Sequence, residues 1–591
     1  MENNTIDRAS RLEKTSWLEK PISDYIPKLT IETVLIALII VLAFVSRMAI
    51  LGERVMSHDE VNHVVPSWDL YEGRVYRHDP VTHGPFQFHL IALSYTLFGD
   101  TDFTSRLPHA LFGIAGIILV IFGFRKFLGR VGSLIAGFLM LISPYMLFYS
   151  RYARNDIIIV FFLCLMFIGV FQYLSTGDKK YLFLISLSLV FQFITKEVAY
   201  IHAAQLLIFI AGLFVYELLR SNWRDSAARR RFLLVLGILM FLVLIAVGSV
   251  IWMKSIEKTV ESTIRSEQGI TDAETPIELP PGTAAMQKMI AAGAAAGVVA
   301  SIVIMAFLAV PNLGWQVIRS KRSFDILMLS GSLILPLLSA FPIQIIGWDP
   351  LDYSTPGMLK TGVFVVIMAA LSLLSGLWWD RKRWPIHAGL FWIIFILFYT
   401  TFFTNAQGFF TGLVGSLGYW LAQQDVQRGS QPLYYYALVQ IPIYEYLPAV
   451  GALAAVLLAW KKGLLSFLTP RQDENQANVP VQENTQETAS VSTRIPVLVM
   501  LFFWSLSALL AYSYAGEKMP QMTLYPTLPN ILMTGWLLGY WVERVDWKQI
   551  LQARSWIVLL LIPVFFAAFS GLMGSLLGTT RPFQGNTLEQ L

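Results

Sequence analysis

Apolar residues form long runs that recur from Ile31 almost to the C-terminus, separated by short polar stretches. A helix that crosses the hydrocarbon core of a bilayer needs about 20 such residues, and a helix satisfies its own backbone hydrogen bonds there. The pattern therefore predicts an all-α polytopic membrane protein with about 13 to 15 transmembrane helices. The predicted spans lie near residues 31–51, 106–124, 131–149, 156–174, 181–194, 198–219, 232–252, 287–310, 324–346, 360–379, 386–403, 443–460, 495–515, 522–542 and 555–577. The segment 84–98 is either a further span or a helix at the membrane interface.

The composition excludes a soluble multidomain enzyme. Hydrophobic residues make up 55% of the 591 positions and charged residues only 14%, with a mean hydropathy of +0.58, whereas soluble domains contain about a quarter charged residues. The net charge of +5 does not indicate nucleic-acid binding, because the basic residues are spread over many short loops. The single cysteine, Cys164, lies inside an apolar run, so no intrachain disulfide is expected.

The distribution of basic residues predicts the orientation in the membrane. With a cytoplasmic N-terminus, the cytoplasmic segments hold 28 of the 44 Lys and Arg residues and the opposite side holds 14. Cytoplasmic loops of membrane proteins are enriched in these residues, so this orientation is favoured. We therefore expect a multi-pass protein of the plasma membrane, with the long loops 52–105, 253–286 and 404–442 on the external face.

The same pattern divides the chain into segments. The expected organisation is a cytoplasmic segment (1–30), a catalytic transmembrane module (31–252) that includes the first external loop with its interfacial helices (52–105), an external loop (253–286), a second transmembrane module (287–460) with its own external loop (404–442), a disordered cytoplasmic linker (461–494), C-terminal transmembrane helices (495–577) and an external tail (578–591). The linker is rich in Gln, Asn, Glu, Thr and Ser, which cannot bury a core.

Candidate chemistry concentrates in the predicted external loops. The first loop begins with His58, Asp59 and Glu60 directly after the first span. Ionisable groups held close to a bilayer are costly, so they are candidates for function. Three further groups combine acids with bases on the same predicted face: Arg151 and Arg154 with Asp156, Lys196 with Glu197, and Glu517 with Lys518. A salt bridge with a purely structural role remains an alternative for the last two.

This combination suits a reaction on a lipid-linked phosphate. Cations stabilise a departing phosphate, and a carboxylate accepts the proton of an attacking hydroxyl. Metal binding is an alternative use of the donors His58, Glu60, His63, His78 and His83, which share one loop. Their spacing does not match the His-Glu-x-x-His pattern of a zinc site on one helix face. No metal ligands are predicted, and a requirement for a divalent cation is left open.

At these residues the sequence resembles the GT-C membrane glycosyltransferases, the superfamily that includes protein O-mannosyltransferases and the aminoarabinose transferase acting on lipid A. The resemblance rests on sequence motifs distributed along most of the chain: Asp59-Glu60, His83-Gly84-Pro85, Phe98-Gly99 with Ser105-Arg106-Leu107-Pro108, Tyr152-Ala153-Arg154-Asn155-Asp156, Thr195-Lys196-Glu197 and Gly516-Glu517-Lys518-Met519-Pro520. Most of them are similar to an archaeal and bacterial branch whose members are often labelled flippase-activity-associated proteins.

The resemblance implies a polyprenyl-phosphate sugar donor. By that analogy Asp59 is the general base, Glu60 is its neighbour in the site, and Asp156 orients the donor or acceptor. The aminoarabinose transferases have Lys-Pro-Pro where this sequence has His83-Gly84-Pro85, so a lysine contact to the donor phosphate does not carry over. Arg151, Arg154, Lys196 and Lys518 take that role by charge and predicted topology, and His58, His83 and Glu197 complete the predicted substrate-binding set.

The predicted function is therefore transfer of a sugar from a polyprenyl-phosphate donor to a hydroxyl of a protein, lipid or glycan acceptor. Asp59 acts as the base in an inverting displacement, and Gly408-Phe409-Phe410 or Tyr434-Tyr435-Tyr436 either stack on the sugar or form an interfacial aromatic belt. The alternative is a transporter, flippase or flippase-associated subunit for lipid-linked sugars. The enzyme hypothesis requires Asp59 and Asp156 to meet in one cavity.

Overall fold

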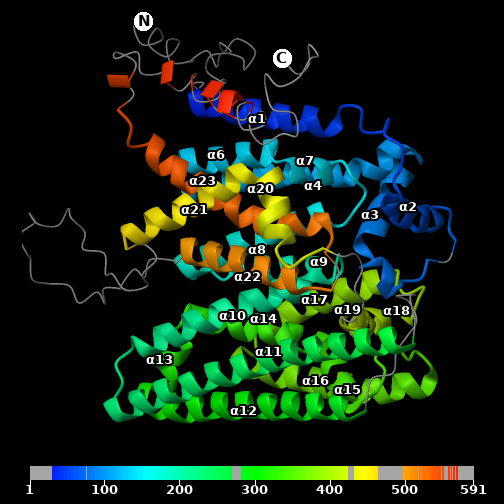
Figure 1. The fold of residues 1–591 in the computed structure, drawn as a ribbon, viewed down its shortest axis with the longest axis vertical. Helices are drawn as coiled ribbons and strands as arrows, with labels where there is room; N and C mark the ends of the chain where they lie inside the picture. The colour runs from blue at the N-terminus through cyan, green and yellow to red at the C-terminus, as the bar shows by residue number, and fades with distance from the viewer. Residues whose placement is uncertain are drawn as a thin grey trace, which may run out of the picture.

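The computed structural model describes residues 30–546 apart from 75, 269–280, 424–430, 464–496 and 517, together with scattered residues between 549 and 571. Every regular element in this part of the chain is a helix, which confirms the predicted all-α fold. The long helices lie side by side with roughly parallel axes (Figure 1).

The helices occur in three successive groups. The first comprises α1 (Ile31–Met48), α2 (His58–Tyr71), η3 (Pro80–Thr82), α3 (Phe86–Phe98), α4 (Asp102–Gly123), α5 (Arg125–Leu128), α6 (Arg130–Ile142), α7 (Pro144–Ser150), α8 (Asp156–Thr176), α9 (Lys180–Phe193) and α10 (Val198–Leu219). The second comprises α11 (Ser226–Gln268), α12 (Pro281–Leu313), α13 (Trp315–Arg319), α14 (Arg322–Ile334), η4 (Leu335–Leu338), α15 (Ala340–Ile346), α16 (Thr355–Trp379) and α17 (Trp384–Tyr399). The third comprises α18 (Gly408–Phe410), η5 (Thr411–Gly415), α19 (Ser416–Gln423), η6 (Tyr435–Gln440), α20 (Ile441–Tyr444), α21 (Tyr446–Lys461), α22 (Val497–Tyr514), η7 (Pro520–Thr523) and α23 (Leu524–Val542).

Among the described residues, seven helices are long and apolar enough to cross a membrane, and the number rises to ten if three bent pairs each form one span. The seven are Ile31–Met48, Asp102–Gly123, Asp156–Thr176, Val198–Leu219, Ala296–Leu313, Thr355–Trp379 and Val497–Tyr514. The bent pairs are Arg130–Ile142 with Pro144–Ser150, Arg322–Leu338 with Ala340–Ile346, and Tyr435–Tyr444 with Tyr446–Lys461. The protein is therefore an integral multi-pass membrane protein.

Two predicted loops are more helical than their sequences indicated. α11 continues to Gln268 and α12 begins at Pro281, so most of the predicted loop 253–286 extends the two helices beyond their apolar parts. Hydropathy marks only the part of a helix that suits lipid, whereas polar residues continue it into water. The predicted loop 404–442 contains α18, η5, α19, η6 and part of α20.

Several predicted segments lie wholly or mostly outside the described residues. These are the N-terminal segment 1–30, the linker 461–494, the last predicted span 555–577 and the tail 578–591. The segment 84–98, left open between a span and an interfacial helix, contains the short apolar helix α3.

The bundle is organised around α8, whose side chains are apolar on every face and largely buried. A helix that is apolar all round belongs in the interior of a bundle. Elsewhere, glycines let α6 and α23 approach closely, since a Cβ atom at Gly535 would lie 2.6 Å from the carbonyl oxygen of Gly132. Small residues at such crossings are typical of membrane helix packing.

The short helices α2, α3, α18 and α19 gather at one end of the long helices, at the right in Figure 1, and α13 lies at the opposite end. α2 and α3 pack against each other, and they form the predicted helix pair of the first loop. The loops at this end bring together residues from the first third of the chain, from α19 and from the residues around η7.

Candidate active site

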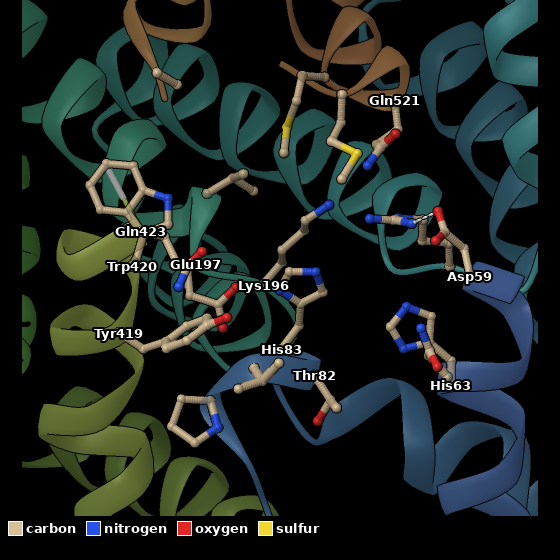
Figure 2. A pocket seen from close by; sticks show the side chains of 18 of the residues that line it. Asp59, His63, Thr82, His83, Lys196, Glu197, Tyr419, Trp420, Gln423 and Gln521 are labelled. Atoms are coloured by element: carbon tan, nitrogen blue, oxygen red, sulfur yellow. Dashed lines mark hydrogen bonds and ion pairs between the residues drawn. The ribbon is translucent and has the colours of Figure 1, made fainter. Parts of the chain in front are cut away.

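A pocket of about 610 Å³ opens at this end of the bundle. Its polar and aromatic lining comes from five regions that are far apart in the sequence, namely α2 with the η3 loop, the turn before α8, the turn before α10, α19, and the end of α22 with the residues around η7. These lining residues include Asp59, His63, His83, Arg154, Lys196, Glu197, Tyr419, Trp420, Tyr512 and Gln521. Figure 2 shows Lys196 and His83 near the centre of the pocket, Asp59 and His63 on one side, and Tyr419 and Trp420 on the other.

Glu60 does not face this pocket, which corrects its predicted catalytic position. Its carboxylate is fully buried against α4 and accepts hydrogen bonds from Arg106 at 2.8 and 3.0 Å and from Arg54 at 2.8 Å. The backbone N–H groups of Ser57 and Ala153 complete a set of five donors. Burial alone would raise the pKa of Glu60, but these donors outweigh burial and the pKa lies below its ordinary value.

Asp59 points in a different direction, toward the pocket, because neighbouring helix positions are turned by about 100°. Its side chain is 48% exposed, and its Oδ2 atom forms an ion pair with Arg154. Within the described part of the chain, the Oδ1 atom has no hydrogen-bond partner. Asp59 therefore presents a fixed carboxylate with one oxygen available to a bound molecule.

Asp156 lies behind the pocket wall and not on its surface. Its side chain is fully buried, and Oδ1 accepts hydrogen bonds from Lys196 Nζ at 2.6 Å and from the Tyr525 hydroxyl at 2.7 Å. Oδ2 lies 3.4 Å from Nε of Arg154. Arg154 thus links Asp59 to Asp156, but only Asp59 reaches the cavity. The predicted meeting of the two aspartates in one cavity is therefore wrong, and the enzyme hypothesis rests instead on Asp59 and on the two cations that Asp156 holds. Asp156 fixes the two cations, and its role in orienting the donor or acceptor stays a prediction.

His83 and Glu197 form a second acid–base pair in the pocket. His83 Nδ1 lies 2.7 Å from Glu197 Oε2, and Glu197 is only 6% exposed. Burial alone would raise the pKa of Glu197, but His83 and Lys196 outweigh burial and the pKa lies below its ordinary value. Glu197 is therefore an ionised acceptor for the imidazole N–H group.

The backbone at His83 is strained. Its φ of 72° and ψ of −171° lie in a region that is essentially restricted to glycine, and a side chain there costs about 1–3 kcal/mol. The next residue, Gly84, packs so closely that a Cβ atom would lie 2.3 Å from the Ile194 carbonyl oxygen. Strain of this kind persists where the surrounding structure enforces it, and it is concentrated at functional sites.

His78 holds this strained loop through a hydrogen bond to the His83 backbone. Its Nε2 atom lies 3.1 Å from the His83 carbonyl oxygen and its Nδ1 atom lies 2.8 Å from the Thr411 hydroxyl. A carbonyl only accepts, so Nε2 carries the proton and Nδ1 accepts from Thr411. Burial lowers the pKa of His78 to about 4, which keeps the imidazole neutral.

His63 is a wall residue that the sequence indicated only as a candidate metal donor. It lies four positions after Asp59 on α2, so helical spacing alone predicts that both share one face. Its ring centroid lies 6.1 Å from that of His83. Burial lowers the pKa of His63 well below its ordinary value, and the charges of His83 and Arg154 add to this effect.

Three predicted substrate-binding residues do not line the pocket. His58 is exposed, and Arg151 donates instead to the carbonyl oxygen of Ser46 at the end of α1, at 2.7 Å. Lys518 donates to the carbonyl oxygen of Ala515 at 3.3 Å, beside the pocket but outside its lining. Arg154, Lys196, Glu197 and His83 do line it.

The aromatic contribution comes from a different place than predicted. The pocket is lined by Tyr419, Trp420 and Gln423 of α19 and by Tyr512 of α22, whereas the segments 408–410 and 434–436 do not line it. The side chain of Tyr436 is buried instead, with its hydroxyl donating to the carbonyl oxygen of Met519 at 3.0 Å. No sequence signal distinguished α19 from the other aromatic stretches of this loop.

The acids and histidines of the site do not converge as metal ligands would. Among the residues that the structure describes, no three His, Cys, Asp or Glu side chains are grouped so that they could hold a metal ion. The ionised groups of the site are instead arranged as pairs of acid and base.

One family model matches part of the chain. Residues 82–252 match the family model described as dolichyl-phosphate-mannose-protein mannosyltransferase. The match covers less than a third of the chain, and it includes His83, Arg154, Lys196 and Glu197. Over these residues it confirms the resemblance to the GT-C superfamily that the motifs predicted. No curated protein matches the sequence.

Two solved structures are similar to the chain at low identity. The chain is similar to the oligosaccharyltransferase of Archaeoglobus fulgidus in the apo form, with 12% identity, a TM-score of 0.43 and coverage of 89% of this chain and 52% of that chain. It is also similar to ArnT from Cupriavidus metallidurans bound to undecaprenyl phosphate, with 14% identity, a TM-score of 0.25 and coverage of 86% and 76%. The chain thus spans about half the length of the oligosaccharyltransferase.

Proposed function

We propose that this protein is a membrane glycosyltransferase that transfers a sugar from a polyprenyl-phosphate donor to an acceptor hydroxyl. The observation that carries this proposal is the pocket, where the half-exposed carboxylate of Asp59 lies beside two fixed cations, Arg154 and Lys196. The family match over residues 82–252 supports a lipid-phosphate donor, because that family is named for dolichyl-phosphate mannose.

Each charged group has a role in a single inverting displacement. Asp59 Oδ1 accepts the proton of the acceptor hydroxyl while the hydroxyl oxygen attacks the anomeric carbon. The bond from this carbon to the phosphate oxygen breaks, and the polyprenyl phosphate leaves with the bonding electron pair. Arg154 and Lys196 stabilise the negative charge that develops on the phosphate, in a site where burial strengthens electrostatic interactions.

Asp156 is buried outside the pocket lining, and it acts on the reaction through the two cations that it pairs with. A buried lysine without a partner tends to lose its proton, but Lys196 forms a 2.6 Å ion pair with Asp156. Asp156 also lies near Arg154. The buried carboxylate therefore keeps both cations charged and oriented toward the pocket.

The aromatic wall suits the sugar. Tyr419 and Trp420 lie opposite Asp59 (Figure 2), and aromatic rings provide large, rigid apolar surfaces on which the C–H face of a sugar packs. We place the polyprenyl chain against the apolar surfaces of the neighbouring helices, at whose end the pocket lies.

We place this pocket on the external face. The positive-inside distribution of Lys and Arg supports a cytoplasmic N-terminus. The location of α2, α3 and α19 at one end of the long helices and of α13 at the other (Figure 1) agrees with the predicted alternation of loops.

The test uses the purified full-length protein in lipid nanodiscs. It is incubated with dolichyl-phosphate mannose and other polyprenyl-phosphate sugars, with and without chelator, and with alkyl glycosides or hydroxyl-rich peptides as acceptors. We expect release of polyprenyl phosphate with at least one donor, and loss of about 10²- to 10⁴-fold of this activity in Asp59→Asn.

Asp69→Asn is the matched control, since Asp69 lies on the same helix in an exposed ion pair with Arg74 at 3.2 Å. Full activity of Asp59→Asn would refute Asp59 as the base. Movement of a lipid-linked sugar across a liposome membrane without formation of a glycosidic bond would instead support the transport alternative.

A further inference from the structure

The His83–Glu197 pair leaves one ring nitrogen of His83 available to a bound molecule. Glu197 is ionised, and a carboxylate only accepts, so the proton of this hydrogen bond resides on Nδ1 of His83. Among the described residues, Nε2 has no hydrogen-bond partner, and the side chain is 25% exposed in the pocket. Figure 2 shows His83 in the middle of the pocket, beside Lys196.

The surroundings of His83 fix its position unusually firmly. The backbone N–H groups of Gly84 and Phe86 donate to the carbonyl oxygens of Thr195 and Ile194 at 3.2 and 3.0 Å, so the loop is fastened to the turn that carries Glu197. The His83 carbonyl oxygen is held by His78. These contacts maintain a backbone conformation that favours glycine at a position occupied by histidine.

Ion pairs account for most of the fixed charges around His83. The directly paired groups Asp59, Arg154, Asp156 and Lys196 form a chain of two acids and two bases that is neutral overall. Glu197 adds a negative charge whose directly bonded partner is His83. A bound phosphodiester adds another negative charge, and a protonated His83 between the two would offset one of them.

Building on the proposed glycosyl transfer, we propose that His83 is the proton donor to the departing phosphate and that Glu197 is its positioning residue. As the bond between the anomeric carbon and the phosphate oxygen breaks, Nε2–H of His83 gives its proton to the phosphate. Asp59 receives the proton of the acceptor hydroxyl. The products are the glycoside and the polyprenyl phosphate as a monoanion, with Asp59 protonated and His83 neutral, and exchange of one proton with water restores both.

Proton transfer between these groups is chemically well matched. An ordinary imidazolium and the second ionisation of a phosphate monoester lie within about one pH unit of each other, and general acids are most effective under such conditions. Glu197 is the directly bonded partner of His83, and Lys196, Arg154 and His63 line the same pocket. His78, which holds the loop, stays neutral.

The test measures release of dolichyl phosphate from dolichyl-phosphate mannose by the full-length protein in nanodiscs, across a range of pH. We expect the wild-type rate to fall as the pH rises and His83 loses its proton. In His83→Gln, whose amide donates a hydrogen bond but no proton, kcat falls about 10²-fold, the donor KM changes little and the alkaline decline disappears. In Glu197→Gln the decline shifts to lower pH, because the imidazolium loses its carboxylate partner.

His83→Gly provides a second, independent measurement. Glycine adopts the observed backbone conformation without strain, which partly offsets the loss of the ion pair with buried Glu197, so this variant should still fold. The space left by the ring should let added imidazole restore turnover, whereas imidazole should not restore Asp59→Asn. A donor with phosphorothioate in place of phosphate has a less basic leaving group, which needs a proton donor less. With this donor, the difference in kcat between His83→Gln and the wild type should be smaller.

The outcomes separate the two proposals. Release by the wild type with an unchanged kcat in His83→Gln overturns the role of His83 and leaves the glycosyltransferase proposal intact. The role of His83 is also overturned, and the glycosyltransferase proposal left intact, if the alkaline decline of the rate persists in His83→Gln and imidazole fails to restore the turnover of His83→Gly. Absence of release by the wild type with every donor of the panel overturns both proposals.

Discussion

The two sides of α2 place neighbouring acids in opposite situations. On the side that packs against α4, Glu60 is buried and both oxygens are saturated by five donors. On the side that faces the pocket, Asp59 is half exposed and keeps one oxygen without a partner among the described residues. A carboxylate whose hydrogen bonds are complete holds structure together, whereas one with remaining capacity can accept a proton from a substrate.

The strongest test of this contrast compares Glu60→Gln with Asp59→Asn. Removing the charge of Glu60 leaves Arg106 buried without its ionic partner, and such a loss costs about 3–5 kcal/mol. Asp59 is half exposed, so its ion pair contributes no more than about 1 kcal/mol. Unfolding followed in detergent should therefore show a large loss of unfolding free energy for Glu60→Gln and a small loss for Asp59→Asn. The loss of transfer activity, in contrast, should be larger for Asp59→Asn. Equal destabilisation of both variants would contradict the distinction.

A second test addresses the cations of the pocket. In Lys196→Gln the donor phosphate loses a charge-assisted hydrogen bond of about 1.5–3 kcal/mol, so the donor KM should rise by roughly 10- to 100-fold. Asp156 keeps Tyr525 and Arg154 as partners, so the fold should survive. Kinetics with a titrated donor provide the measurement, and Arg74→Gln, outside the pocket, serves as the control. An unchanged KM would show that Lys196 is purely structural.

A third test uses pH to compare a buried neutral group, His78, with the buried ion pairs of Glu60. His78 is neutral in the folded protein with a pKa of about 4, below the ordinary 6.5. Its contribution to stability is complete above pH 6.5 and declines as the pH falls toward 4, because the unfolded chain binds a proton that buried His78 does not. The loss of unfolding free energy at pH 5, relative to pH 7, should be on the order of 1–2 kcal/mol. The lowered pKa of Glu60 means that its ion pairs persist until the pH falls below about 4.5.

Thermal unfolding at pH 7 and pH 5 measures this difference. His78→Gln should unfold with a smaller pH dependence over this range than the wild type. An identical dependence in both proteins would show that His78 is not responsible.

The smallest expected effect concerns the aromatic wall. Trp420→Ala should raise the donor KM by a few-fold, in line with the roughly 0.5–1.5 kcal/mol of an aromatic contact. Trp420→Phe keeps a ring at this position and should restore most of the affinity. If both variants bind the donor as the wild type does, α19 contributes only shape to the pocket.

Much of the architecture is determined by the sequence alone. Lipid offers no hydrogen bonds to the backbone, so long apolar runs must form helices, and the polar stretches between them must lie at the ends of those helices. For this reason the motifs around Asp59, His83, Arg154 and Lys196 already indicate residues of one site. The shared helical face of Asp59 and His63 is equally predictable, because residues four positions apart on a helix are neighbours.

Other properties are decided by tertiary contacts. The Ser57-x-x-Glu60 spacing is a local signal that places Glu60, and not Asp59, in a capping box. The burial of Glu60 is decided by a distant contact, because Arg106, which lies 46 residues after Glu60, packs against α2. The burial of Asp156 likewise depends on Lys196 and on Tyr525, which is 369 residues away. Helical spacing determines which residues share a face, but only the packing of distant helices determines what that face meets. The charge and exposure of each carboxylate, and hence its chemistry, follow from that packing.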